Sequence, residues 1–205
     1  MTIYRHFFLV KTLALILVIA VSIYAKLFTY SVGSVFHPPE YSPYFTVSLL
    51  TNVFQILCTI PVILCLFSWA LLRTIKPLNQ TTNFLLISTI LTGSFLLLEF
   101  FRLHVHLQKL GVPKVITAII LGIIAIGYGL IFWRVIQSTP YFLLLTSMGL
   151  MFIVVIVDSL KLRGDGIPSL LEGVPKLFSE INVVLYYWEF CFREVKRTMT
   201  NSVEG

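Results

Sequence analysis

Apolar segments of about twenty residues recur along this chain, and charged side chains are almost absent from them. A helix needs about twenty such residues to cross the hydrocarbon core of a bilayer, so the pattern predicts an all-α membrane protein. The composition agrees, because 58% of the residues are hydrophobic and 12% are charged, whereas soluble proteins carry about 25% charged residues. A mean hydropathy of +0.93 excludes both an ordinary soluble domain and a disordered chain.

Five of these segments are clear transmembrane candidates, and a sixth segment is amphipathic. We predict spans near residues 7–25, 49–72, 84–101, 115–133, 141–157 and 170–192. The later loops are short, so consecutive helices should pack antiparallel. The expected fold is therefore a bundle of six transmembrane helices, which forms a single integral membrane domain over residues 1–205.

The first segment has some features of a signal peptide, because a positive charge precedes its apolar stretch. Ile23 and Ala25 stand where a cleavage site requires two small residues. We therefore predict a retained first helix, in which Lys11 lies one turn inside and extends its ammonium group to the interface.

Residues 168–195 are open to two interpretations. Apolar side chains follow helical spacing there, and Glu172, Lys176 and Glu180 form a polar stripe at positions i, i+4 and i+8. One interpretation is an amphipathic helix lying in the membrane interface. The other, which we favour, is a sixth span that turns this stripe into the bundle. The consecutive aromatic residues 186–188 (Tyr-Tyr-Trp) are expected to be exposed, as interface anchors or as a partner face.

The fourth predicted span carries a seam of small residues. The seam consists of Ala118, Gly122, Ala125 and Gly129. Such a seam lets another helix backbone approach closely, which is how membrane helices associate. We expect it to pack against another helix of the same chain rather than form a dimer face.

Ionisable side chains gather at one predicted membrane face. Glu99 ends the third span and is followed by His104 and His106, Asp158 ends the fifth span, and Glu172 opens the last helix. Alternating topology places the ends of the third and fifth spans on the same side. Because ionisable residues at membrane spans are costly, these five are the candidate site residues.

Three interpretations of this group stay open. Histidine nitrogens and carboxylate oxygens suit a divalent metal, whose bound water could attack an ester, amide or phosphoester. A proton or quinone site is the second interpretation. The third is a set of ion pairs that cap helix ends, such as Glu99 with Arg102 and Asp158 with Lys161. The sequence contains no H-E-x-x-H, G-x-S-x-G, Walker A or dinucleotide motif.

The net charge of +6 favours contact with anionic lipid headgroups, and no basic run suggests nucleic acid. The expected partners are the lipid bilayer and other membrane-protein subunits. Cys58, Cys65 and Cys191 lie in apolar segments without a C-x-x-C spacing, so buried thiols are expected rather than disulfides or a zinc site. Eight basic residues on one predicted side against seven on the other leave the orientation open.

Residues 96–104 (LLLEFFRLH), followed by Gly111-Val112-Pro113, resemble a bacterial family of small polytopic membrane proteins. In that family a span ends with paired acids, four residues and His-Glu, and a Gly-x-Pro turn follows. Its last helix opens with Leu-Glu-Asp-Gly, which residues 171–173 (Leu-Glu-Gly) resemble.

The resemblance covers about residues 84–195 and implies a sixth span and a bacterial-type plasma or internal membrane. Carried over by position, it indicates Glu99, His104 and Glu172 as site residues. Leu98 replaces the first acid and Val105 replaces the glutamate after the histidine. The resemblance therefore implies an architecture and a candidate site, but no reaction.

The leading functional expectation is a scaffold or accessory subunit of a membrane complex. The alternative is a metal-dependent membrane hydrolase or a redox or quinone-binding protein, with its site at one membrane face. Under that alternative, the metal would be held by Glu99, His104, His106, Asp158 and Glu172. A proton or quinone site would use Glu99, His104 or His106, and Asp158.

Overall fold

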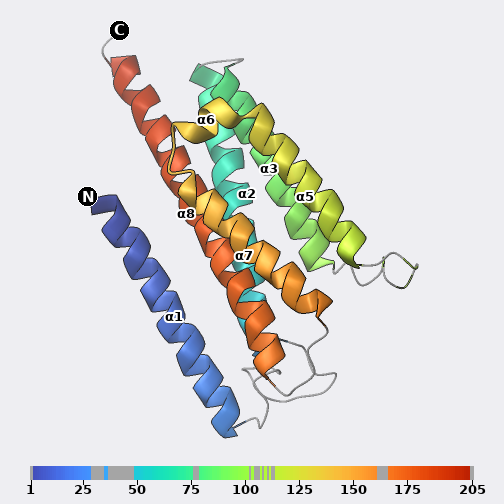
Figure 1. The fold of residues 1–205 in the computed structure, drawn as a ribbon. Helices are drawn as coiled ribbons and strands as arrows, with labels where there is room; N and C mark the ends of the chain where they lie inside the picture. The colour runs from blue at the N-terminus through green and yellow to red at the C-terminus, as the bar shows by residue number, and fades with distance from the viewer. Residues whose placement is uncertain are drawn as a thin grey trace. The chain divides into compact units, whose positions relative to one another are not determined.

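The computed structural model describes residues 2–28, 35–36, 49–75, 79–101, 103, 107, 109, 111, 114–160 and 166–203. Over these residues the chain forms seven α-helices and no strand, which confirms the all-helical class (Figure 1). Four helices are long and apolar enough to cross a membrane. They are Arg5–Phe28, Leu49–Ile75, Gln80–Phe100 and Phe142–Ser159.

Each predicted span coincides with a helix. The helices are α1 (Thr2–Phe28), α2 (Leu49–Ile75), α3 (Gln80–Phe100), α5 (Lys114–Ile131), α6 (Trp133–Gln137), α7 (Phe142–Ser159) and α8 (Ile167–Val203). The last helix is much longer than predicted, with 37 residues. The apolar part of α5, Ile119–Ile131, is shorter than a full span.

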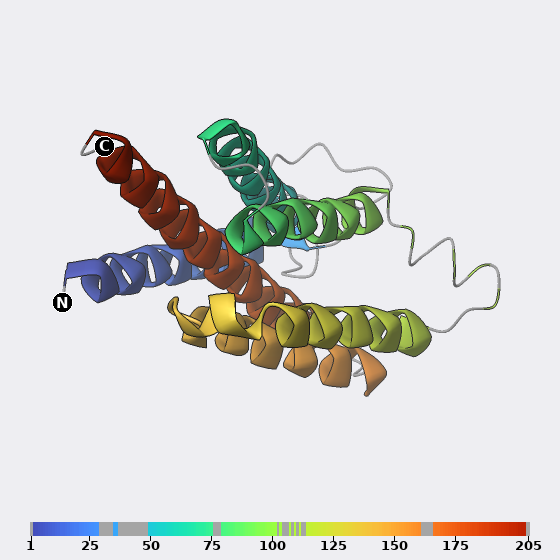
Figure 2. The ribbon, with the colours of Figure 1, turned by 90° about the horizontal axis from the view of Figure 1, so that it is seen from above.

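The junction of α5 and α6 is a single turn residue, Phe132. Phe132 separates the two helices with φ −103° and ψ 18°, yet its amide still donates to Tyr128 O and its carbonyl accepts from Ile136 N. The hydrogen bonds therefore continue through the junction. Seen from above, α6 follows the direction of α5 (Figure 2), but the view in Figure 1 shows that α6 turns away from the axis of α5.

Residue contacts divide the chain into two compact units. One unit is Met1–Ile56 with Thr146–Asn182, and the other is Leu57–Leu145 with Val183–Gly205. We call them the first and the second unit. The helices α2 and α8 contribute residues to both.

The second unit is built around one phenylalanine. The ring centroid of Phe84 on α3 lies 5.6 Å from Tyr128, 5.3 Å from Phe132, 6.5 Å from Tyr187 and 4.8 Å from Phe190. Phe84 itself is fully buried. Aromatic contacts of this kind add to the burial of large apolar surfaces. This cluster, which we call the aromatic junction, joins α3, α5 and α8.

The first unit is held by close approaches of α7, α8 and the start of α2. The hydroxyls of Ser147 on α7 and Ser179 on α8 lie 2.8 Å apart, and both residues are buried. Thr51 on α2 donates to the carbonyl of Phe36 over 2.7 Å. The ring of Phe36 in turn occupies the space beside Gly173, where an added Cβ would overlap it. Small side chains permit these approaches.

The helix α8 corrects one sequence expectation. Tyr186 and Tyr187 were expected to be exposed together with Trp188, but they are 0% and 2% exposed, whereas Trp188 is 55% exposed. Successive residues of a helix point about 100° apart, so three in a row cannot share one outer face. The two tyrosines belong to the core of the second unit, and only the tryptophan faces outward.

Candidate functional site

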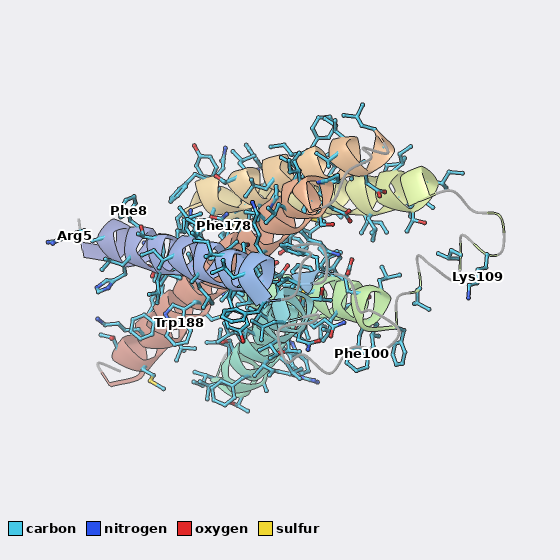
Figure 3. All side chains as sticks on the ribbon, turned by 90° about the horizontal axis from the view of Figure 1, so that it is seen from below. Arg5, Phe8, Phe100, Lys109, Phe178 and Trp188 are labelled. Atoms are coloured by element: carbon cyan, nitrogen blue, oxygen red, sulfur yellow. The ribbon has the colours of Figure 1, made fainter. Side chains whose placement is uncertain are left out.

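Three of the five candidate residues lie in the described part of the chain. Glu99 is the last residue but one of α3, in the second unit, and Phe100 beside it marks this helix end in Figure 3. Asp158 is the last residue but one of α7, and Glu172 lies in the second turn of α8, both in the first unit. All three are partly buried. Their positions near helix ends agree with the sequence analysis.

The two histidines of the candidate group, His104 and His106, lie outside the described residues. Among the residues that the structure does describe, no three histidine, cysteine, aspartate or glutamate side chains gather closely enough to hold a metal. The metal site therefore stays a prediction that depends on these two histidines.

The described polar side chains gather instead inside the helix contacts of the second unit. Ser88 on α3 lies 2.6 Å from the hydroxyl of Tyr128 on α5, which lies 3.2 Å from the hydroxyl of Tyr187 on α8. Ser88 is fully buried and Tyr187 nearly so. Three hydroxyl groups from three helices thus form one hydrogen-bonded chain beside the aromatic junction.

Two further contacts bring α8 to its neighbours in this unit. Thr139, after α6, is hydrogen-bonded to the hydroxyl of Tyr186 over 3.1 Å. The thiol of Cys191 is hydrogen-bonded to the thiol of Cys65 and the hydroxyl of Ser68, both on α2. All three cysteines are free and buried, as expected. The pairing of Cys65 with Cys191 was not predictable from the sequence, because no local spacing signals a contact between helices that are distant along the chain.

The chemistry of this network is that of helix association. A buried hydroxyl is costly unless it is hydrogen-bonded, and each tyrosine hydroxyl named above has a partner on another helix or in the turn after α6. Hydrogen bonds of this kind stabilise helix pairs in membranes by about 0.6–2 kcal/mol each. The arrangement fixes which helices are neighbours.

The first unit holds a charged residue and an unsatisfied amide. The ammonium of Lys176 lies 4.6 Å from the ring centroid of Phe54, in a cation–π contact. Asn182 is 1% exposed and donates from Nδ2 to Phe178 O over 2.7 Å. Its Oδ1 is buried without a hydrogen-bond partner among the described residues. Such an acceptor is destabilising by about 1–3 kcal/mol.

A hollow of about 390 Å³ lies between the start of α3 and the end of α5. Gln80 and Asn83 supply its polar lining, and Leu86, Ile87, Ile131 and Phe132 supply the apolar lining. A mainly apolar lining with few polar groups suits an acyl chain or an apolar side chain better than a polar substrate.

The fold and these contacts define a helical protein with several apolar helices suited to a membrane. The chain belongs to the DUF8692 family, described as a domain of unknown function, whose model matches residues 8–189. Neither the curated proteins nor the solved structures contain a match. The similarity of residues 96–104 to a bacterial family of polytopic proteins stays a prediction.

Proposed function

We propose that this protein is a six-span integral membrane protein that serves as a scaffold or accessory subunit of a membrane complex. The proposal places it in a bacterial-type plasma or internal membrane. Its support comes from the burial along α8, the hydrogen bonds between helices, and the open face of α5.

The burial pattern of α8 supports a sixth span over an interfacial helix. A helix lying in the interface turns its polar side chains to water, but Glu180 and Asn182 are 6% and 1% exposed. Between residues 181 and 192 the exposed side chains are Trp188 and Phe192, and both are aromatic. With 37 residues, α8 is about 55 Å long, which exceeds the roughly 30 Å of a hydrocarbon core.

The observation that carries the scaffold proposal is the use of the buried hydroxyl groups. Ser88, Tyr128 and Tyr187 bond to one another across three helices, and Ser147 bonds to Ser179 across two. These hydroxyl groups form hydrogen bonds between helices. Such bonds hold the helices of a structural subunit together.

The small-residue seam of α5 is evidence that a helix of a partner protein packs against α5. It was expected to pack within the chain, but a Cβ added at Gly122 or Gly129 would meet no atom of the described chain within 4 Å. The seam is flanked by exposed Ile119, Ile123 and Ile126. A groove of glycine and alanine between branched side chains is the geometry that a second membrane helix fits.

The test is purification from native membranes in mild detergent, with quantification of stoichiometric companions. We expect a companion subunit with the natural chain and its loss with Gly129→Leu on α5. The matched control is Gly149→Leu on α7, where an added Cβ also meets no described atom. Equal melting temperatures for both variants would show that neither change unfolds the chain.

Three results would overturn the proposal. The first is a natural chain that purifies without a companion, and the second is a companion that both variants retain equally. The third is a stoichiometric metal in the purified protein that is lost in Glu99→Ala or His104→Ala, because this would favour the metal-dependent alternative.

A further inference from the structure

The three tryptophans of the chain all belong to the second unit. Trp69 lies near the end of α2, Trp133 begins α6, and Trp188 lies on α8. Trp133 and Trp188 are 49% and 55% exposed, and Trp188 is labelled in Figure 3. The chain thus places every indole ring in one of its two units.

Side-chain contacts put these tryptophans at one level of the unit. Phe84 touches both Phe132, which precedes Trp133, and Phe190, which follows Trp188 by two residues. On α2, the neighbour of Trp69 is Ser68, which bonds to Cys191 next to Phe190. Each tryptophan therefore lies within about one helical turn of the aromatic junction or of the α2–α8 contact beside it.

Basic residues follow each tryptophan toward the same end of the unit. They are Arg73, Arg134, Arg193, Lys196 and Arg197, all of them exposed. We call these five residues the basic collar. The guanidinium of Arg73 lies 5.2 Å from the ring centroid of Trp69.

The acids near the collar on α8 are Glu189 and Glu194. Glu189 is buried and lies 3.7 Å from Arg193 in an ion pair, and Glu194 is partly buried. The collar keeps a net positive charge after both acids are subtracted, because five basic groups face two acidic ones.

This order of residues matches the profile of a membrane interface. Tryptophans favour the headgroup level, and basic side chains beyond them meet the phosphates of anionic lipids. The helix α5 has 18 residues from Lys114 to Ile131, just before Trp133. It is about 27 Å long, and its apolar part, Ile119–Ile131, accounts for about 20 Å of that length and ends at the level of the tryptophan.

We propose that the basic collar binds the anionic phospholipid headgroups of one leaflet and so fixes the collar at the anionic face of the membrane. The inference rests on membrane insertion and not on the scaffold role. It adds the orientation that the near-equal count of basic residues left open, since anionic lipids are concentrated in the cytoplasmic leaflet.

The tryptophans supply the measurement, because lipids with brominated acyl chains quench the fluorescence of indoles that touch them. The full chain is reconstituted in phosphatidylcholine with increasing brominated phosphatidylglycerol, and in parallel with brominated phosphatidylcholine. We expect the anionic lipid to bind about tenfold more strongly, and this preference to fall as salt is raised.

The test variant is Arg134→Gln with Lys196→Gln, in which two exposed collar charges are removed. The control is Lys26→Gln with Lys109→Gln, in which two exposed charges outside the collar are removed. We expect the preference to fall to near-equal binding in the first variant and to persist in the second.

Three outcomes would overturn the inference: equal quenching by both brominated lipids, a preference that the collar variant keeps, or an equal loss in both variants. Competition by a soluble acidic peptide but not by anionic vesicles would assign the collar to a protein instead. A natural chain that shows no preference for the anionic lipid but still co-purifies with a companion subunit would refute this inference alone, so the two proposals fail separately.

Discussion

At Gly173 the helix α8 has no room for a methyl group. The ring of Phe36 lies where the Cβ of any other residue would be, and Thr51 holds the Phe36 backbone by a hydrogen bond. In the sequence, Gly173 was recognisable only as part of a family-like Leu-Glu-Gly pattern. Its packing role could not be predicted, because the aromatic ring comes from a segment more than a hundred residues away.

The substitution Gly173→Ala is therefore expected to destabilise the protein by about 1–3 kcal/mol through overpacking. The control is Gly149→Ala on α7, where the added Cβ meets open space and the better helix propensity of alanine should be neutral or stabilising by up to about 1 kcal/mol. Thermal unfolding in detergent measures both changes. Equal shifts would show that Phe36 does not occupy this space.

A second prediction concerns the hydroxyl of Tyr128, which bridges Ser88 and Tyr187. Tyr128→Phe removes one partner from each of these two hydroxyls. Ser88 keeps its hydrogen bond to Phe84 O, and we expect a loss of about 1–2 kcal/mol in unfolding free energy. Tyr141→Phe, at a residue that is 44% exposed, removes the same atom without that consequence. A Tyr128→Phe variant as stable as Tyr141→Phe would contradict the bridging role.

At the scale of the element, α8 shows which buried residues helical periodicity predicts and which it does not. The spacing of Leu177, Ile181 and Leu185 predicted a helix with an apolar face, and all three are buried. The polar residues Ser179, Glu180 and Asn182 are buried too, although an amphipathic helix in water would expose them. Lipid does not solvate polar groups, so in a membrane protein polarity no longer identifies the outer face.

The contact of α2 with α8 can be tested through its thiols. Mild oxidation by dioxygen with a copper catalyst should join Cys65 to Cys191, with loss of two protons and two electrons to the oxidant. Oxidised and then unfolded protein should take up one maleimide, whereas the untreated chain takes up three, one for each cysteine.

The matched control uses the remaining cysteine. Cys58→Ser should keep the cross-link, because Cys58 lies seven residues before Cys65 on the same helix, and Cys65→Ser should abolish it. Uptake of three maleimides by the oxidised natural chain would mean that the two helices are not neighbours at this level.

At the scale of the whole molecule, the sequence predicted the all-helical class and the position of every long helix. Stretches of apolar residues carry that information directly. The sequence did not predict which helices touch, because lipid and helix are equally apolar and association depends on a few small or polar side chains. Of the candidate site, Glu99, Asp158 and Glu172 were placed at helix ends correctly, and the metal site is untested because the two histidines lie outside the described residues.

The orientation gives a prediction at this scale. If the basic collar meets the cytoplasmic leaflet, the segment of α8 beyond it lies in the cytoplasm. A Met199→Cys variant, at a residue that is 53% exposed, should react with a membrane-impermeant maleimide only after the cells are opened. The native cysteines are buried and provide the background. Labelling of intact cells would place this end outside and reverse the orientation.

The length of α8 has a mechanical consequence. From Trp188 to Val203 the helix continues without a break, which corresponds to about 22 Å at 1.5 Å per residue. An unbroken helix of this length is stiff. A partner that binds its last turns would therefore be held at a fixed distance from the bilayer.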